Sequence, residues 1–121
     1  MIKKYTKYPY SEDRLQQAVA RLLDSYNLLW MHCPNELKAK PQYLKKRASM
    51  GVKSGVPDCL ILTPNNKYKG MAIELKVGYN KPTDNQLKWL DDLKKIGYYT
   101  LVSYSLEQVI DIVEAYVKNK L

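Results

Sequence analysis

A carboxylate and an ammonium group stand two residues apart at Glu74 and Lys76, within the run MAIELKV over residues 71–77. The run alternates as a β-strand does, so Ala72, Glu74 and Lys76 share one face. Strand geometry places the two charged side chains about 7 Å apart along that face. An acid at the start of one strand, followed by Glu-x-Lys in the next, is the arrangement that a metal-dependent phosphodiesterase needs.

The acid at the start of a strand is Asp58. It follows Gly55-Val56-Pro57 and opens a second apolar run at residues 59–62. Phosphodiester hydrolysis needs a metal to neutralise the phosphate, an activated water and stabilisation of charge in the transition state. We expect Asp58 and Glu74 to bind a hard cation such as Mg²⁺, which prefers oxygen ligands. Lys76 is then expected to hold the attacking water or to meet the developing negative charge.

Three further groups are candidates for the same site. Glu12 precedes Leu15 by three residues and Val19 by seven, so it lies on the apolar stripe of its helix and faces the core side. Glu12 and the backbone carbonyl of Leu75 are expected as additional oxygen ligands. Gln86, at the head of a later helix, could reach towards the attacking water.

Each of these residues also has an ordinary structural interpretation. Glu74 and Lys76 could belong to a solvated strand face, because a bare Glu-x-Lys motif is short. Asp58 could be a turn acid, Glu12 a first-turn acid favoured by the helix dipole, and Gln86 only a capping residue. Their joint occurrence in this element order favours the site.

The elements that must position these residues follow from the apolar periodicity. Ser11, Thr83 and Ser105 are predicted N-caps, with Gln86 and Gln108 completing two capping boxes. Residues 64–70 read as a turn, which predicts a hairpin between the strands that flank it. The predicted order αβββαβα indicates one α/β domain over residues 1–121, a small mixed sheet flanked by helices. The predicted helices are 11–27, 84–96 and 106–117, and the predicted strands are 28–33, 58–63, 71–77 and 98–103.

A long basic loop is predicted at residues 34–57, with room for one short helix. Residues 37–57 contain no acid, and the whole chain carries 20 Lys and Arg against 12 Asp and Glu, a net charge of +8. This balance suits a polyanion such as nucleic acid, although a generic basic protein would share it. The predicted DNA-binding residues are Lys38, Lys40, Lys45, Lys46, Arg47 and Lys53.

The cysteines and the hydropathy limit the remaining possibilities. Cys33 and Cys59 lack metal-ligand spacing and lie in apolar runs, so we expect buried free thiols in a reducing, cytoplasmic setting. The apolar runs fall short of the 18 residues that a membrane span needs, and the first residues lack a signal-peptide pattern. His32 is interpreted as a packed or loop-edge residue rather than a ligand.

In its ordered motifs the chain resembles the PD-(D/E)xK nuclease superfamily, and more narrowly the virus-type replication-repair nuclease (VRR-NUC) family in its stand-alone phage or bacterial form. The resemblance covers about residues 11–117 and departs from the family in its long, Lys-rich segment 37–57. The residues that carry it are Ser11-Glu12 with Gln16, Asn35-Glu36, Gly55-Val56-Pro57-Asp58, Ile73-Glu74-Leu75-Lys76, Gln86 with Trp89-Leu90 and Leu93, and Gly97-Tyr98.

The resemblance implies a restriction-endonuclease-like core and Mg²⁺- or Mn²⁺-dependent cleavage of DNA. It assigns metal binding to Glu12, Asp58 and Glu74, and the catalytic lysine role to Lys76. Gln86 matches the glutamine of the family's motif. Stand-alone members are similar to Holliday-junction resolvases and tend to be homodimers. A phage-encoded member would act in the cytoplasm of its host.

Three functions therefore compete at this point. The leading hypothesis is a structure-selective endonuclease acting on branched DNA. The second is a restriction-type or host-DNA-degrading endonuclease, which would usually carry an added recognition module that 121 residues do not accommodate. The third is a non-catalytic nucleic-acid-binding module, which would not need Asp58, Glu74 and Lys76 together.

Overall fold

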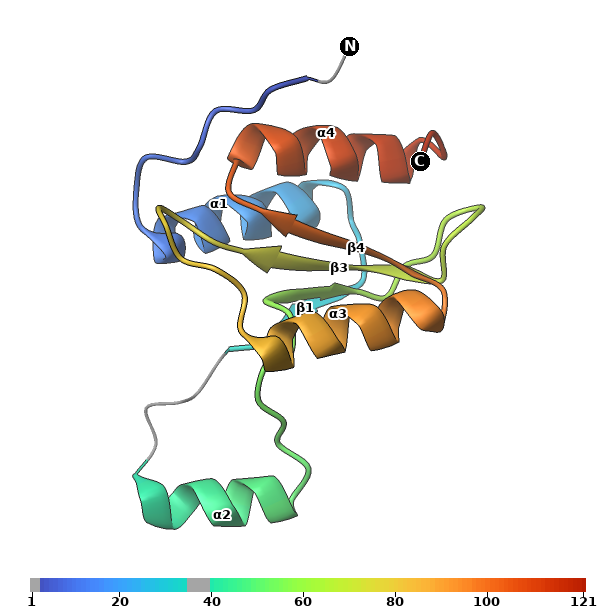
Figure 1. The fold of residues 1–121 in the computed structure, drawn as a ribbon. Helices are drawn as coiled ribbons and strands as arrows, with labels where there is room; N and C mark the ends of the chain where they lie inside the picture. The colour runs from blue at the N-terminus through green and yellow to red at the C-terminus, as the bar shows by residue number, and fades with distance from the viewer. Residues whose placement is uncertain (1–2, 35–39) are drawn as a thin grey trace.

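A computed structural model describes residues 3–34 and 40–121. Within these ranges a mixed four-stranded sheet lies between helices, in the strand order β1-β2-β3-β4 (Figure 1). β1 pairs with β2 and β2 with β3 in antiparallel fashion, whereas β3 and β4 are parallel. The elements are α1 (Glu12–Ser25), β1 (Trp30–His32), α2 (Pro41–Ser49), β2 (Cys59–Ile61), β3 (Gly70–Leu75), α3 (Asp84–Lys95), β4 (Tyr98–Ser103) and α4 (Leu106–Val117).

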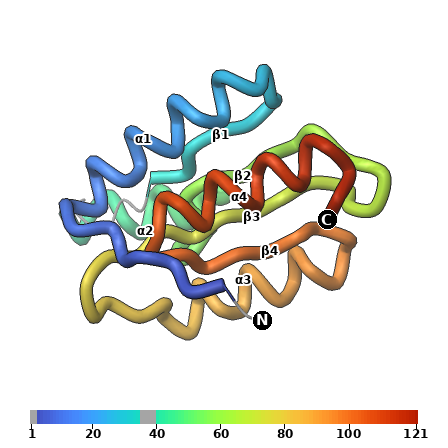
Figure 2. Tube along the Cα trace, turned by 90° about the horizontal axis from the view of Figure 1, so that it is seen from above, coloured from blue at the N-terminus to red at the C-terminus, as the bar shows by residue number. Residues whose placement is uncertain are grey.

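The helices cover the sheet on both faces. α1 and α4 lie side by side over one face, and α3 packs on the other (Figures 1 and 2). Along β3, Met71, Ile73 and Leu75 join the core under α1 and α4, while Ala72 joins the smaller core under α3 with Leu90. The predicted alternation of β3 is therefore confirmed, with the difference that both of its faces are buried.

The predicted helix starts are confirmed in detail. The Ser11 side chain accepts a hydrogen bond from the Arg14 N–H, and Thr83 and Gln86 form a complete capping box. Ser105 accepts from the Gln108 N–H, but the Gln108 side chain accepts from the Ser103 hydroxyl at 2.6 Å. The predicted second capping box is thus present in one direction only, because the buried Ser103 hydroxyl competes for the glutamine oxygen.

The segment between β1 and β2 differs most from the predicted order. It contains the helix α2, so the observed order is αβαββαβα. α2 stands away from the sheet and none of its residues is buried (Figure 1). A helix without buried residues needs no apolar stripe, which is why periodicity gave no definite boundaries for it. Pro41 begins the helix, and Lys46 and Arg47 in its last turn complement its dipole.

The cysteines, the N-terminal segment and the helix lengths bear on the remaining predictions. Cys33 and Cys59 are both free, with Cys59 buried and Cys33 half-buried. The N-terminal segment is bound to the body through the Tyr8 N–H, which donates to the Tyr104 carbonyl at 2.8 Å. In the described part of the chain, each helix is too short or too polar to cross a membrane.

Candidate active site

The strand pairing brings Asp58 beside Glu74. Cys59 is paired with Ile73 in the antiparallel register of β2 and β3, so the residue before Cys59 meets the residue after Ile73. Asp58 lies immediately before β2, and Glu74 lies one residue from the end of β3. Lys76 follows the strand directly. The acid of one strand and the Glu-x-Lys pair of the next therefore meet at one end of the sheet, as predicted.

Hydrogen bonds fix the two carboxylates relative to each other. The Asp58 N–H donates to Glu74 Oε1 at 3.2 Å, and the Leu75 N–H donates to Asp58 Oδ2 at 2.7 Å. Lys76 Nζ lies 3.2 Å from Glu74 Oε2. Each acid is thus oriented by the backbone of the other strand, and this reciprocal arrangement restricts both side chains to the same small volume.

Burial makes negative charge costly at this position. The Glu74 side chain is 1% exposed and that of Lys76 is 12% exposed. Burial, followed by the charge of Asp58, raises the pKa of Glu74 to about 7, against the opposing effect of Lys76. Burial also raises the pKa of Asp58, although the Leu75 N–H opposes it. Two desolvated carboxylates share a single ammonium, so a further positive charge would stabilise the pair.

Glu12 approaches the same group from α1. It is half-buried, and its pKa is raised first by burial and then by the charge of Asp58, with Lys76 acting in the opposite direction. The prediction that it faces inward is therefore confirmed. Among residues 3–34 and 40–121, however, no three acidic, histidine or cysteine side chains are close enough to hold a metal by themselves. The role of Glu12 as a ligand stays a prediction.

The donor set nevertheless fits a hard divalent cation. Mg²⁺ is commonly held by one or two carboxylates, with phosphate oxygens and water completing its coordination. Asp58 and Glu74 provide two carboxylates that are already desolvated and share one counter-charge. Leu75 lies between Glu74 and Lys76 in the chain. The role of its backbone carbonyl as a third oxygen ligand stays a prediction.

Gln86 is buried and its side chain already has a structural task. Its Oε1 accepts a hydrogen bond from the Thr83 N–H at 2.9 Å, closing the capping box of α3. This contact supports the capping interpretation that competed with a catalytic one. A contact between Gln86 and the attacking water stays a prediction.

With this geometry in place, the comparison with known families is decisive. The family model for the VRR-NUC domain matches residues 10–106, which include each of the acids above, Lys76 and Gln86. The chain belongs to the VRR-NUC family. It therefore contains a nuclease-type domain, and the α/β nuclease core that the sequence predicted is confirmed.

Solved structures agree with this assignment. A structure described as a "VRR_NUC domain protein" is 28% identical to this chain, covers 92% of it and 91% of its own length, and has a TM-score of 0.74. A second, described as a "VRR_NUC domain", is 24% identical, covers 87% of this chain and 96% of its own, and has a TM-score of 0.59, which supports the shared fold. No curated protein matches the chain.

Basic residues of this VRR-NUC domain gather on the segment that projects from the sheet. We call residues 40–53 the arm. Lys40, Lys45, Lys46 and Lys53 are exposed there, and Arg47 is half-buried. Lys38, also predicted to bind DNA, lies outside the described residues, as do Asn35 and Glu36. The arm contains no acid, so its field is uniformly positive.

Sequence reasoning undervalued His32. It is exposed on β1, and its Nδ1 lies 2.7 Å from the Asp58 carbonyl oxygen, to which it donates. A positive charge on this ring favours the ionised form of Asp58 and so lowers the pKa of that carboxyl. The strand pairing of His32 with Cys59 produces this contact. One sequence feature indicated this role, because the only histidine of the chain lies in a short predicted strand. That indication is weak on its own.

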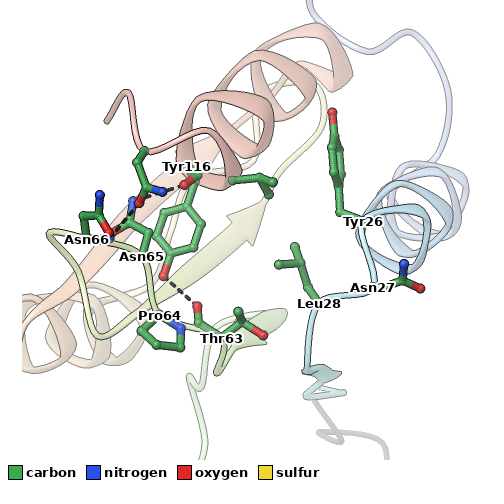
Figure 3. A pocket seen from close by; sticks show the side chains of 10 residues that line it. Tyr26, Asn27, Leu28, Thr63, Pro64, Asn65, Asn66 and Tyr116 are labelled. Atoms are coloured by element: carbon green, nitrogen blue, oxygen red, sulfur yellow. Dashed lines mark hydrogen bonds between the residues drawn. The ribbon is translucent and has the colours of Figure 1, made fainter.

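A pocket at the far end of the sheet is not part of this site. Its lining residues lie at or just after the C-terminal ends of α1, β2 and α4, whereas Glu12 begins α1 and Asp58 precedes β2 (Figure 3). It has a volume of about 460 Å³ and is lined by tyrosine, asparagine, threonine and apolar residues without a charged side chain. Tyr116 closes one wall and donates to the Thr63 carbonyl at 2.7 Å. It lacks the acids that phosphodiester chemistry requires.

Proposed function

We propose that this VRR-NUC domain is a Mg²⁺- or Mn²⁺-dependent endonuclease that hydrolyses phosphodiester bonds in branched DNA, in the manner of a Holliday-junction resolvase. The observation that carries the proposal is the buried group of Asp58, Glu74 and Lys76, held by reciprocal backbone hydrogen bonds. A desolvated pair of acids with one ammonium is unfavourable in a purely structural role, because burial raises the pKa of both acids and the charge of Asp58 raises that of Glu74 further.

Each residue has a defined task in this proposal. Asp58 and Glu74 would hold the cation, with Glu12 and the Leu75 carbonyl contributing further oxygens. When bound, the cation would neutralise the phosphate and favour water activation. Lys76 is 3.2 Å from Glu74 and would stabilise the negative charge that develops on the phosphate oxygens. Gln86 would orient the attacking water through the part of its amide that the helix cap leaves available.

The arm supports DNA as the partner. Its exposed lysines act as point charges on phosphate, which gives affinity without reading bases. The described residues show no additional domain that would enter a groove and read sequence. Recognition of DNA shape is therefore favoured over recognition of sequence, and branched DNA offers such a shape.

A homodimer would supply what the resolution of a four-way junction requires. Two opposed strands must be nicked, and one domain offers one catalytic group. A two-fold dimer matches the two-fold symmetry of the junction. Free thiols at Cys33 and Cys59 suit a reducing compartment, so we propose that the dimer acts in the cytoplasm, or in the host cytoplasm if a phage encodes it.

Labelled DNA substrates test this function directly. Duplex, flap and four-way junction DNA would be incubated with Mg²⁺, with Mn²⁺ and with a chelator. We expect cleavage of branched DNA that stops when the metal is removed. Cleavage in the chelator would exclude the metal mechanism, and equal cleavage of plain duplex would favour the host-DNA-degrading alternative. Binding of all substrates without cleavage under any metal would favour a non-catalytic module.

A further inference from the structure

The chain between the arm and Asp58 is hydrogen-bonded to α3 through Ser54. Trp89 Nε1 donates to the Ser54 carbonyl at 3.1 Å, and Asn85 Nδ2 donates to the Ser54 hydroxyl at 3.1 Å. Both donors are side chains of α3, one turn apart on the same face. We call Asn85 and Trp89 the α3 clamp. It holds the backbone and the side chain of the same residue, four positions before Asp58.

The residues that follow Ser54 have little freedom to move. Gly55 has φ +80°, and a Cβ at this position would lie 2.7 Å from the Asn85 Cβ, so the backbone packs directly on α3. Pro57 is fully buried and has a fixed φ. Asp58 then enters its hydrogen bonds with β3. From the clamp to the acid, the chain is constrained at nearly every step.

The arm is more exposed than the chain from Gly55 to Pro57. None of the residues of α2 is buried, and Gly51 has φ +95° with open space around it. If the arm binds phosphate, it will be displaced when the DNA moves. Only residues 54–57 separate the arm from Asp58. Without an anchor, force on the arm would reach the acid.

We propose that Asn85 and Trp89 are positioning residues, which anchor the chain at Ser54 so that Asp58 keeps its place beside Glu74 while the arm grips DNA. This inference rests on the proposed function. It assigns a task to two α3 side chains that touch neither the phosphate nor the metal. A displacement of about 1 Å at a catalytic acid can reduce a rate by about 100-fold, so such an anchor has a measurable effect.

The test uses Trp89→Phe and Asn85→Ala in the full chain. Phenylalanine keeps an aromatic ring and loses the N–H donor, and alanine keeps the Cβ that packs on Gly55. Trp30→Phe is the matched control, because Trp30 Nε1 donates in the same way to Asp24 at 2.7 Å, on α1. Three quantities are measured: the Mn²⁺ concentration for half-maximal single-turnover cleavage, the Mn²⁺-induced rise in Tm without DNA, and the Kd for junction DNA in Ca²⁺.

We expect both clamp variants to need roughly three- to tenfold more Mn²⁺, the effect of one lost hydrogen bond on an equilibrium constant. They should also show a smaller Mn²⁺-induced rise in Tm, with the Kd for DNA unchanged. Trp30→Phe should match the wild type in all three. A general loss of stability would lower the Tm without Mn²⁺ and leave the size of the Mn²⁺ response unaltered.

Two results would overturn the proposal. One is a wild-type Mn²⁺ requirement in both clamp variants. The other is a weakened Kd for DNA with an unchanged Mn²⁺ response, because the clamp would then serve the arm and not Asp58. Failure of the proposed function is a separate outcome, since the wild-type protein itself would then neither cleave DNA nor respond to Mn²⁺.

A pair of glycine substitutions provides an independent test. Gly55→Ala and Gly51→Ala carry similar backbone strain, because both positions have positive φ, but only Gly55 is in close contact with Asn85. Gly55→Ala should therefore raise the Mn²⁺ requirement more than Gly51→Ala does. Equal effects of the two substitutions would contradict the positioning role.

Discussion

Replacing Glu74 by glutamine should stabilise the metal-free protein relative to wild type progressively as the pH rises. Glu74 has a pKa of about 7 in the folded chain, raised from 4.5 by burial and by Asp58. Between these two values the folded state binds more protons than the unfolded state does. The free energy of unfolding therefore falls as the pH rises through this window. Glutamine resembles the protonated acid and does not titrate, so its variant escapes this loss.

The magnitude follows from the size of the pKa change. One pKa unit corresponds to about 1.4 kcal/mol, so the difference between variant and wild type should grow by up to about 3 kcal/mol from pH 4.5 to pH 8.5. For a chain of this size that corresponds to about 10 °C in Tm. Because glutamine also alters hydrogen bonds, the diagnostic quantity is the change of this difference with pH, rather than its value at one pH.

The assay is thermal or urea unfolding at several pH values in the presence of a chelator. Glu114→Gln is the matched control, because Glu114 and Lys118 form another Glu–Lys pair, with side chains 44% and 54% exposed. This pair is exposed to water, so the substitution removes a Glu–Lys contact without removing a buried charge. Parallel pH profiles for Glu74→Gln and the wild type would refute the claim that burial of the Glu74 charge is costly.

Three further outcomes are expected. Glu12→Gln should weaken Mn²⁺ binding to DNA-bound, catalytically inactive protein in calorimetry, whereas an effect on Tm alone would make Glu12 a helix-dipole residue. Neutralising Lys45, Lys46 and Arg47 together should weaken binding to branched and linear DNA alike, and reduce the slope of log K against log salt by about one unit per lost phosphate contact. Sedimentation at micromolar concentration should show a homodimer, and a 14 kDa monomer, free and on DNA, would contradict it.

Matched controls distinguish these effects from general changes in charge. Neutralising Lys67, Lys118 and Lys120, at the end of the sheet remote from Asp58, removes the same charge without touching the arm. It should change the salt slope less than the arm substitution does. Equal slopes for the two triple variants would place the DNA elsewhere on the surface.

The sequence predicted the parts of the fold that depend on local signals. The β3 alternation, the caps at Ser11 and Thr83, and β4 at residues 98–103 all follow from periodicity and from side chains that bond to nearby backbone. The helix α2 had no definite prediction, because it buries nothing and therefore leaves no apolar pattern. Local periodicity reports which face of an element is buried, and no residue of α2 is buried.

The site was predictable only in part, for a similar reason. Glu74 lies in β3, and Asp58 and Lys76 lie next to the ends of β2 and β3, so their proximity follows from a hairpin that the sequence indicated. The contact of His32 with the Asp58 carbonyl depends on the pairing of β1 with β2 across 26 residues. The bond from Trp89 to Ser54 spans 35 residues and joins a helix to a loop. No spacing rule relates residues that meet only through tertiary packing.

The rate of metal-dependent cleavage of branched DNA by acid-to-amide variants tests the central claim most directly. Single-turnover rates would be measured for the wild type, Asp58→Asn, Glu74→Gln and the surface control Glu114→Gln at saturating Mg²⁺. Each site substitution should reduce the rate by at least about 100-fold, while the folded state and DNA affinity persist and the control matches the wild type. Near-normal cleavage by Glu74→Gln would contradict the assignment of this buried pair as the catalytic centre.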